Sequence, residues 1–377
     1  MRRILICVLV LTLLLACAAG CSKKETEPPA TTMTVSKPMV VETITPEPET
    51  EPEIVTPAEP VEANPRSDMI NPFTGETVEE SIIGQRPFFV MVNNIILAQP
   101  QVGISKADMI WELMEEGGIT RMMAFFTDLE HVETVGSIRS ARYYNVNITQ
   151  AYDAIIVHAG GSDEALAYIE WDHINNVNAL VNEGTEAFYR DGNRQSYGVE
   201  HSLFGRGAQI VELAEGMGYP QEHDEYFDGT YGLSFSENAA DQCTGDASKI
   251  NITYAGGKTT NFTYDAEKGM YSAEQFGNTY ADNGEEVVYF TNVLILNAET
   301  RLEEDGLHLE IDLEEGGSDG FFCCGGKYLP IKWVRDGYED VFHFYTMDDE
   351  PLELGVGKTF VAVQQTGSYQ GTTEFIA

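Results

Sequence analysis

Residues 115–162 contain the stretch on which the fold depends: EEGGITR at 115–121, GSIRSAR at 136–142 and HAGGS at 158–162. Each of these three polar clusters adjoins an apolar run, so each is expected at a turn beside the end of a strand or helix. Backbone donors and charged side chains can converge on a ligand at such positions. The three clusters are therefore expected to form turns of the fold and to carry any ligand site.

Apolar runs around these clusters predict the elements of the first half of the folded region. Continuous runs predict buried strands at 87–92, 109–114, 122–126 and 154–157. Ser140 is expected to cap a helix that ends at about Ala151, and Ser162 to cap a helix over 163–170. A further amphipathic helix is predicted over 209–216. A strand, a glycine turn and a capped helix in succession are typical of an α/β layer.

The pattern changes after about Pro220. Alternating segments rich in β-branched and aromatic residues follow, separated by turn signals such as Asp282-Asn283-Gly284, and they predict a mainly antiparallel β domain. The predicted fold is therefore α+β. An N-terminal α/β layered domain covers residues 67–225, and a smaller, β-rich C-terminal domain covers residues 226–377.

The charge of the chain limits its partners. The 377 residues include 22 basic and 61 acidic side chains, which gives a formal net charge of −39. Such a surface repels nucleic acid and anionic lipid head groups, so neither is an expected partner of the folded part. Cations, basic proteins and neutral glycans stay open as partners. The acidic residues also have a simpler interpretation, which is solubility of an exposed surface.

The N-terminus predicts the compartment. A basic start, an apolar run from Ile4 to Leu15 and a group of small residues make a secretory signal peptide over residues 1–20. The sequence Ala18-Ala19-Gly20-Cys21 resembles the lipobox of bacterial lipoproteins, which implies an acylated Cys21; Cys17 offers a competing site. The chain is thus expected outside the cytoplasm, anchored by lipid to the bacterial cell membrane.

Residues 21–66 are predicted to form a disordered tether. Residues 22–65 contain nine of the fifteen prolines, nine glutamates and no aromatic residue. This composition cannot bury enough apolar surface to offset the entropy of ordering, and its Pro-Glu runs favour an extended chain. The tether would hold the folded part away from the membrane.

With these clusters placed, the chain resembles the YerB-like family of bacterial lipoproteins, a family of unknown function. The motifs that carry the resemblance are NPFTG at 71–75, VMVNN at 90–94, EGGITR at 116–121, IRSAR at 138–142, HAGGS at 158–162 and GVGKTFVAV at 355–363. Two positions depart from the family pattern: Ser137 stands where proline is expected, and EHSLF at 200–204 stands where the family tends to have PHNLY. The resemblance implies two domains and a membrane anchor, and it supplies no catalytic residue.

The basic residues predict an anion site. Between Ala107 and Ser248 there are six arginines and no lysine: Arg121, Arg139, Arg142, Arg190, Arg194 and Arg206. The planar guanidinium suits bidentate contacts with carboxylate or phosphate. The hypothetical site consists of Glu116, Arg121, Arg139, Ser140, Arg142 and His158. Its ligand would be an anionic cell-wall polymer, a cell-wall peptide or an envelope protein, and the alternative is that the arginines pair internally with Glu115 and Glu116.

A second hypothesis is an enzyme. In one version, His158 is a general base, Ser162 a nucleophile, and the glycine amides between them form an oxyanion hole. In another, an enzyme that processes cell-wall glycan or peptide uses Glu116, His158 and the arginines. N-capping explains Ser162 more simply, and no catalytic residue is assigned. The histidine and acidic spacings predict no metal site and no cofactor. Cys243, Cys323 and Cys324 cannot all pair with one another, and they are expected to be buried apolar residues. The preferred interpretation is a non-enzymatic binding or scaffold protein of the cell envelope.

Overall fold

The computed structural model describes residues 70–79, 82, 84–223, 230–303 and 306–377. These residues belong to one compact unit. The predicted signal peptide, the predicted acylation site at Cys21 and the predicted tether lie outside the described residues.

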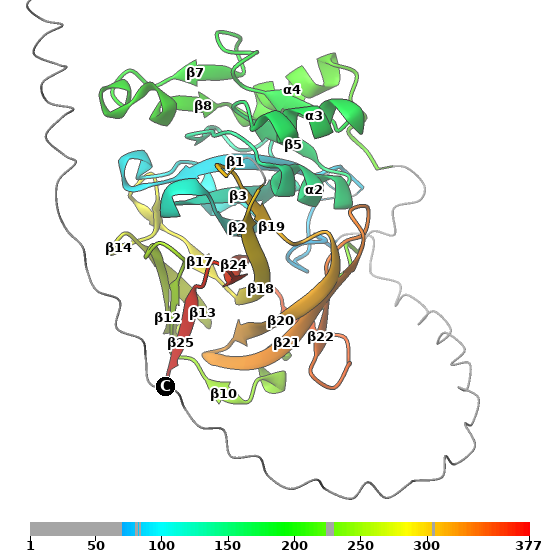
Figure 1. Cartoon of the computed structure of the whole chain (residues 1–377), viewed down its shortest axis with the longest axis vertical. Coiled ribbons are helices and arrows are strands. Elements are labelled where there is room, and N and C mark those ends of the chain that lie inside the picture. Colours follow the sequence, from blue (N-terminus) through cyan, green and yellow to red (C-terminus); the bar gives the residue numbers. More distant parts are fainter. Residues whose placement is uncertain (1–69, 80–81, 83, 224–229, 304–305) are drawn as a thin grey trace, which may run out of the picture. The chain divides into compact units, whose positions relative to one another are not determined.

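The first half of the described chain holds three α-helices and several short strands (Figure 1). Its elements are β1 (Phe88–Asn94), η2 (Ile96–Ala98), η3 (Ile104–Lys106), β2 (Met109–Met114), η4 (Glu116–Gly118), β3 (Thr120–Phe126), β4 (Val135–Gly136), α2 (Tyr143–Ala151), β5 (Ile155–His158), α3 (Asp163–Trp171), β6 (Asn176–Asn178), β7 (Phe188–Arg190), η5 (Gln195–Tyr197), η6 (Val199–His201), β8 (Leu203–Gly205) and α4 (Gly207–Gly216).

The second half is built from strands and one short 3-10 turn. Its elements are β9 (Ser234–Ser236), η7 (Ala239–Gln242), β10 (Gly245–Asp246), β11 (Lys249–Thr253), β12 (Thr259–Asp265), β13 (Met270–Gln275), β14 (Asn278–Thr279), β15 (Ala281–Asp282), β16 (Glu286–Val287), β17 (Tyr289–Phe290), β18 (Asn292–Leu302), β19 (Leu309–Ile311), β20 (Glu315–Cys324), β21 (Lys327–Asp336), β22 (His343–Thr346), β23 (Glu353–Gly355), β24 (Thr359–Gly367) and β25 (Thr372–Ile376).

A large mixed sheet joins the two halves. Its strands follow the order β10-β21-β20-β18-β24-β2-β3-β1-β5-β6. In addition, β19 pairs with β18 and β22 pairs with β21. Strand β24 pairs in parallel with β2 on one side and with β18 on the other. The predicted N- and C-terminal domains therefore share this sheet, while the division at residue 225 stays a prediction.

Strands β1, β2, β3 and β5 of the large sheet are buried on both faces, which explains their continuous apolar runs. Along β1, Phe89 and Met91 enter one apolar cluster, whereas Phe88 and Val90 enter the other. Helices α2 and α3 cover the first face, and Ile210 of α4 packs in the second cluster. The four predicted strands of the first half are confirmed as β1, β2, β3 and β5.

The prediction of an α/β layered first domain overstated the helical content, because the described residues are mostly β. Within the first half, β5 pairs in parallel with β1, and β6 pairs in parallel with β5. The pairs β1–β3 and β2–β3 are antiparallel, and only the five residues 115–119 join the consecutive strands β2 and β3. Figure 1 shows α3 and α4 near β7 and β8 at the top of the view, with β20, β21 and β22 at the bottom.

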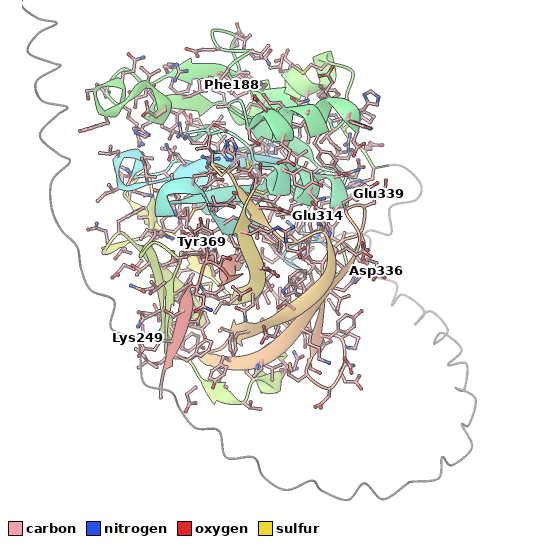
Figure 2. The ribbon with its side chains drawn as sticks, in the orientation of Figure 1. Phe188, Lys249, Glu314, Asp336, Glu339 and Tyr369 are labelled. Atoms are coloured by element: carbon pink, nitrogen blue, oxygen red, sulfur yellow. The ribbon has the colours of Figure 1, made fainter. Side chains whose placement is uncertain are left out.

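A smaller antiparallel sheet completes the second half, in the order β14-β13-β12-β11-β25, with β17 paired to β13. This confirms the predicted antiparallel character of that part of the chain. Gly118 lies so close to Gly256 that a Cβ added at Gly256 would lie 2.6 Å from Gly118 Cα. Side chains fill the layers throughout; Phe188, labelled near the top of Figure 2, is 1% exposed.

The two predicted helix caps have different outcomes. Ser162 caps α3, because its Oγ accepts the N–H of Ala165 at 3.2 Å. The cap predicted at Ser140 is wrong: α2 begins at Tyr143, and Asn145 Oδ1 accepts the N–H of Arg142 at 2.7 Å instead. The segment before Arg142 is extended because it runs along β1, which delays the first helical turn.

Candidate functional site at Arg139

The first two polar clusters meet beside the start of α2. Glu115 and Glu116 follow β2, and Arg121 lies in β3, which pairs with both β1 and β2. The segment that carries Arg139 crosses β1, since the N–H of Arg139 donates to Met91 O at 2.9 Å. The sheet thus brings the predicted arginines together, as the site hypothesis requires, and the name arginine cluster is used below for Arg121, Arg139 and Arg142 with Glu115 and Glu116.

Arg121 is held by internal contacts. It is 4% exposed, and its Nη1 lies 2.8 Å from Glu115 Oε2 and donates to Ser140 O at 2.6 Å. Ser140 thus contributes its carbonyl to the cluster. Burial raises the pKa of Glu115, although Arg121 and Arg142 lie beside it. Tyr144 donates its hydroxyl to the other oxygen of this carboxylate at 3.2 Å.

Arg142 forms a forked contact with Glu116. Its Nη2 lies 2.6 Å from Glu116 Oε2, and its Nε lies 3.0 Å from Oε1. Burial opposes the ionised form of Glu116, but the hydrogen bond and charge of Arg142 outweigh it and lower the pKa of that carboxyl. Glu116 also accepts the N–H of Leu309 in β19 at 3.3 Å. Arg121 and Arg142 therefore follow the internal-pairing alternative.

Arg139 differs from both. It makes no ion pair and no side-chain hydrogen bond with the described residues, and its Nε is buried without a hydrogen-bond partner among them. Burial and the nearby charge of Arg121 lower the pKa of Arg139, while Glu200 and Glu115 act in the opposite direction. Within the arginine cluster, Arg139 is the guanidinium left available to a ligand.

Two further buried groups near this segment lack partners within the described residues. Ser137 Oγ and Asn145 Nδ2 are both buried and make no hydrogen bond. Ser137 lies two residues before Arg139 in an extended segment, so their side chains project to the same side. Asn145 lies in the first turn of α2, where the helix dipole favours an anion. Unsatisfied buried polar groups are costly, and both of these lie within six residues of Arg139 in the chain.

His201 borders the site and was missed by sequence reasoning. Asn93 Nδ2 lies 2.9 Å from His201 Nδ1, and the peptide N–H of Asn93 donates to Ser137 O at 2.9 Å. Burial lowers the pKa of His201, and the charge of Arg139 adds to this effect. The motifs VMVNN and EHSLF contained both residues, but their sequence spacing of more than one hundred residues gave no sign that they touch.

His158 has a structural role in this arrangement. Its Nδ1 lies 2.8 Å from Gly160 O and its Nε2 lies 3.2 Å from Asn176 Oδ1. Burial lowers the pKa of His158, which favours the neutral ring. Ser162 instead accepts from the backbone of α3. The imidazole and the hydroxyl thus serve different partners. The turn nevertheless adjoins the site, because Ala159 donates its N–H to Arg139 O at 2.8 Å.

Two large cavities lie elsewhere. One of about 640 Å³ is bordered by Val102, Tyr189, Phe204 and Asp282 among others, and one of about 580 Å³ by Tyr264, Tyr289, Cys324 and Lys358 among others. Neither is lined by a member of the arginine cluster. Among the residues that the structure describes, no group of three or more histidine, cysteine or acidic side chains is placed to hold a metal ion. No helix in the same residues is long and apolar enough to span a membrane.

The chain matches two family models in sequence order. Residues 73–220 match the N-terminal domain, and residues 250–361 the C-terminal domain, of a protein of unknown function (DUF3048). It is 30% identical over 269 residues to the putative lipoprotein YerB of Bacillus subtilis strain 168, which covers 70% of this chain and 77% of that protein. The chain belongs to the YerB-like family.

The fold supports the same assignment. The crystal structure of the YerB protein from Bacillus subtilis superimposes with a TM-score of 0.70 at 27% identity, covering 81% of this chain and 99% of that one. The resemblance drawn from the sequence motifs is thereby confirmed.

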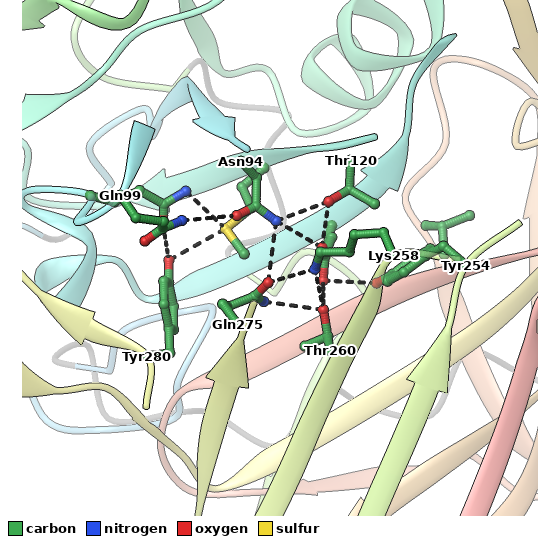
Figure 3. A network of polar contacts seen from close by, with 12 residues as sticks. Asn94, Gln99, Thr120, Tyr254, Lys258, Thr260, Gln275 and Tyr280 are labelled. Carbon is green, nitrogen blue, oxygen red and sulfur yellow. Dashed lines mark hydrogen bonds and ion pairs between the residues drawn. The ribbon is translucent and has the colours of Figure 1, made fainter. Parts of the chain in front are cut away.

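This YerB-like chain also contains a buried polar network between the large sheet and the smaller antiparallel sheet (Figure 3). At its centre the carboxylate of Glu112, in β2, pairs with the ammonium of Lys258. Four neutral groups donate to the same carboxylate: Asn94 at 2.8 Å, Thr120 at 2.6 Å, Tyr254 at 2.9 Å and Thr260 at 2.6 Å. Because these donors come from both sheets, the network fixes their relative position. Cys243, Cys323 and Cys324 are buried free thiols, as predicted.

Proposed function

We propose that this chain is an extracytoplasmic lipoprotein, held to the membrane through an acylated Cys21, that binds an anionic ligand of the cell envelope at Arg139. The relation to a putative lipoprotein supports the anchor, together with the lipobox-like sequence that precedes Cys21. Binding rather than catalysis is favoured because His158 and Ser162 already serve separate structural partners.

The observation that carries the binding proposal is the state of Arg139. In a chain of net charge −39, its guanidinium is half-buried and unpaired, although two neighbouring arginines are paired with carboxylates. A buried charge without a partner is costly, so a ligand carboxylate or phosphate that supplied the partner would gain a charge-assisted hydrogen bond. Asn145 Nδ2 is a further hydrogen-bond donor, and the N-terminus of α2 carries the partial positive charge that favours an anion.

Arg139 is also the residue to change. Removing Arg142 would leave Glu116 without its partner and would disturb the fold, whereas Arg139 forms no ion pair with a carboxylate of the described residues. A matched control is Arg206→Ala, because Arg206 lies over the ring of Tyr189 at 4.4 Å and donates to Glu186 O, outside the arginine cluster.

The test is an NMR titration of the arginine Nε–H signals with inorganic phosphate and with acetate. We expect the Arg139 signal to shift on titration. We expect Arg139→Ala to weaken binding by about tenfold to a hundredfold, which corresponds to one hydrogen bond to a charged group of about 1.5–3 kcal/mol. Arg206→Ala should leave binding unchanged. Equal binding by wild type and Arg139→Ala, with both folded, would exclude Arg139 as the site.

A further inference from the structure

Exposed apolar side chains lie on one border of the Arg139 site. The Gly160–Gly161 turn adjoins Arg139 through the preceding backbone hydrogen bond. Leu180 and Leu166 lie against this turn: a Cβ at Gly160 would lie 3.3 Å from Leu180 Cδ1, and one at Gly161 would lie 3.4 Å from Leu166 Cδ2. Leu180 is 48% exposed and Leu166 37% exposed.

A second loop near this segment also carries exposed apolar side chains. The loop that ends at His201 carries Tyr197 and Val199, which are 60% and 56% exposed. The Arg190 side chain holds this loop in place, since its Nη1 donates a hydrogen bond to Val199 O at 2.6 Å. Ile138 donates its N–H to Leu203 O at 2.8 Å, and Asn93 Nδ2 contacts His201 Nδ1, so this loop lies beside the segment that carries Arg139. The segment that carries Arg139 thus adjoins two loops with exposed apolar side chains.

We propose that this surface docks a partner protein through an apolar segment that presents a carboxylate to Arg139. This deepens the proposed function and rests on it. Protein interfaces combine a central arginine with apolar neighbours, and the charge complementarity between Arg139 and an acidic side chain would fix the register of the segment. A lipid surface suits the chain less well, because a net charge of −39 repels anionic head groups.

The experiment uses three short fluorescent peptides that differ in one property each. The first alternates leucine and aspartate, the second serine and aspartate, and the third leucine and lysine. Fluorescence anisotropy is measured with the complete folded ectodomain. We expect the leucine–aspartate peptide to bind, the serine–aspartate peptide to bind at least about tenfold more weakly, and the leucine–lysine peptide not to bind.

Two variants separate the apolar borders from the cation. A double variant, Leu180→Ser with Val199→Ser, should weaken binding of the leucine–aspartate peptide by about tenfold. Both side chains are exposed, so their replacement leaves the core intact. Met347→Ser, at an exposed residue on the turn after β22, is the control and should change nothing.

The outcomes distinguish this inference from the proposed function. If phosphate binds through Arg139 but both acidic peptides bind equally, or neither binds, the docking surface is refuted and the anion site stands. If neither phosphate nor any of the three peptides binds, both the anion site and the docking surface are refuted. Arg139-dependent binding to vesicles of phosphatidylglycerol without peptide binding, or a dimer in light scattering that the Leu180→Ser change abolishes, would replace the partner protein with a lipid surface or a second copy.

Discussion

Replacing Lys258 with methionine tests how the buried network between the sheets is held. Methionine keeps the unbranched shape of the side chain but lacks its terminal ammonium, which leaves the Glu112 carboxylate buried without a cation. Removing one member of a buried ion pair costs about 3–5 kcal/mol. Glu112 retains its four neutral donors, so we expect the lower end, a loss of about 3 kcal/mol in the free energy of unfolding at pH 7.

The loss should depend on pH. Burial raises the pKa of Glu112, but in the wild type the charge and hydrogen bond of Lys258 outweigh this and hold the pKa below its ordinary value of 4.5. The ionised carboxylate therefore stabilises the wild type above about pH 4.5, and this contribution is lost as the pH falls through the lowered pKa. In Lys258→Met burial prevails and the pKa of Glu112 rises, so the variant recovers stability as the pH falls toward 4.5.

The assay is urea unfolding of the ectodomain at pH 7 and at pH 5. We expect the difference between wild type and Lys258→Met to be largest at pH 7 and to shrink at pH 5. Lys268→Met is the control, because Lys268 is largely exposed with its ammonium 3.7 Å from Asp265, and such pairs contribute at most about 1 kcal/mol. Similar losses for both variants, or a Lys258→Met loss that does not change with pH, would refute the reasoning.

Three further predictions concern a helix cap, a close backbone contact and the anchor. Ser162→Ala should lower stability by about 1 kcal/mol in urea unfolding, whereas Ser162→Asp, which keeps a capping oxygen, should not. Gly256→Ala should lower the melting temperature in calorimetry, because its Cβ would meet Gly118 and its φ of 98° suits glycine; an unchanged melting temperature would contradict that contact. Cys21→Ser should release the protein into the culture medium, as judged by immunoblotting, and release by Cys17→Ser instead would move the cleavage site.

The sequence predicted local elements better than their assembly. Continuous apolar runs identified strands such as Phe88–Asn94 because both faces of these strands are buried. The helix cap at Ser162 was predictable because capping depends on neighbouring residues only. The pairing of β24 with β2 was not predictable, since about 250 residues separate strands whose alignment depends on the whole sheet. The same limitation led to the expectation of a layered first domain.

The candidate site shows the same division. Arginine content and the three polar clusters indicated where charge would gather, and the sheet does bring Arg121, Arg139 and Arg142 together. Which arginine stays unpaired depends on side-chain geometry, so all three arginines were equally good candidates for a ligand contact at the level of the sequence. The contact of Asn93 with His201 joins two segments that lie far apart in the chain, so no local sequence pattern predicted it.

The position of β24 has a consequence for the order of assembly. This strand follows β2 and β18 in the chain but lies between them in the large sheet, so β2 and β18 each keep an unpaired edge until β24 has been synthesised. A stop codon shortly before Thr359 would therefore yield a fragment with two open strand edges, which favour aggregation and proteolysis.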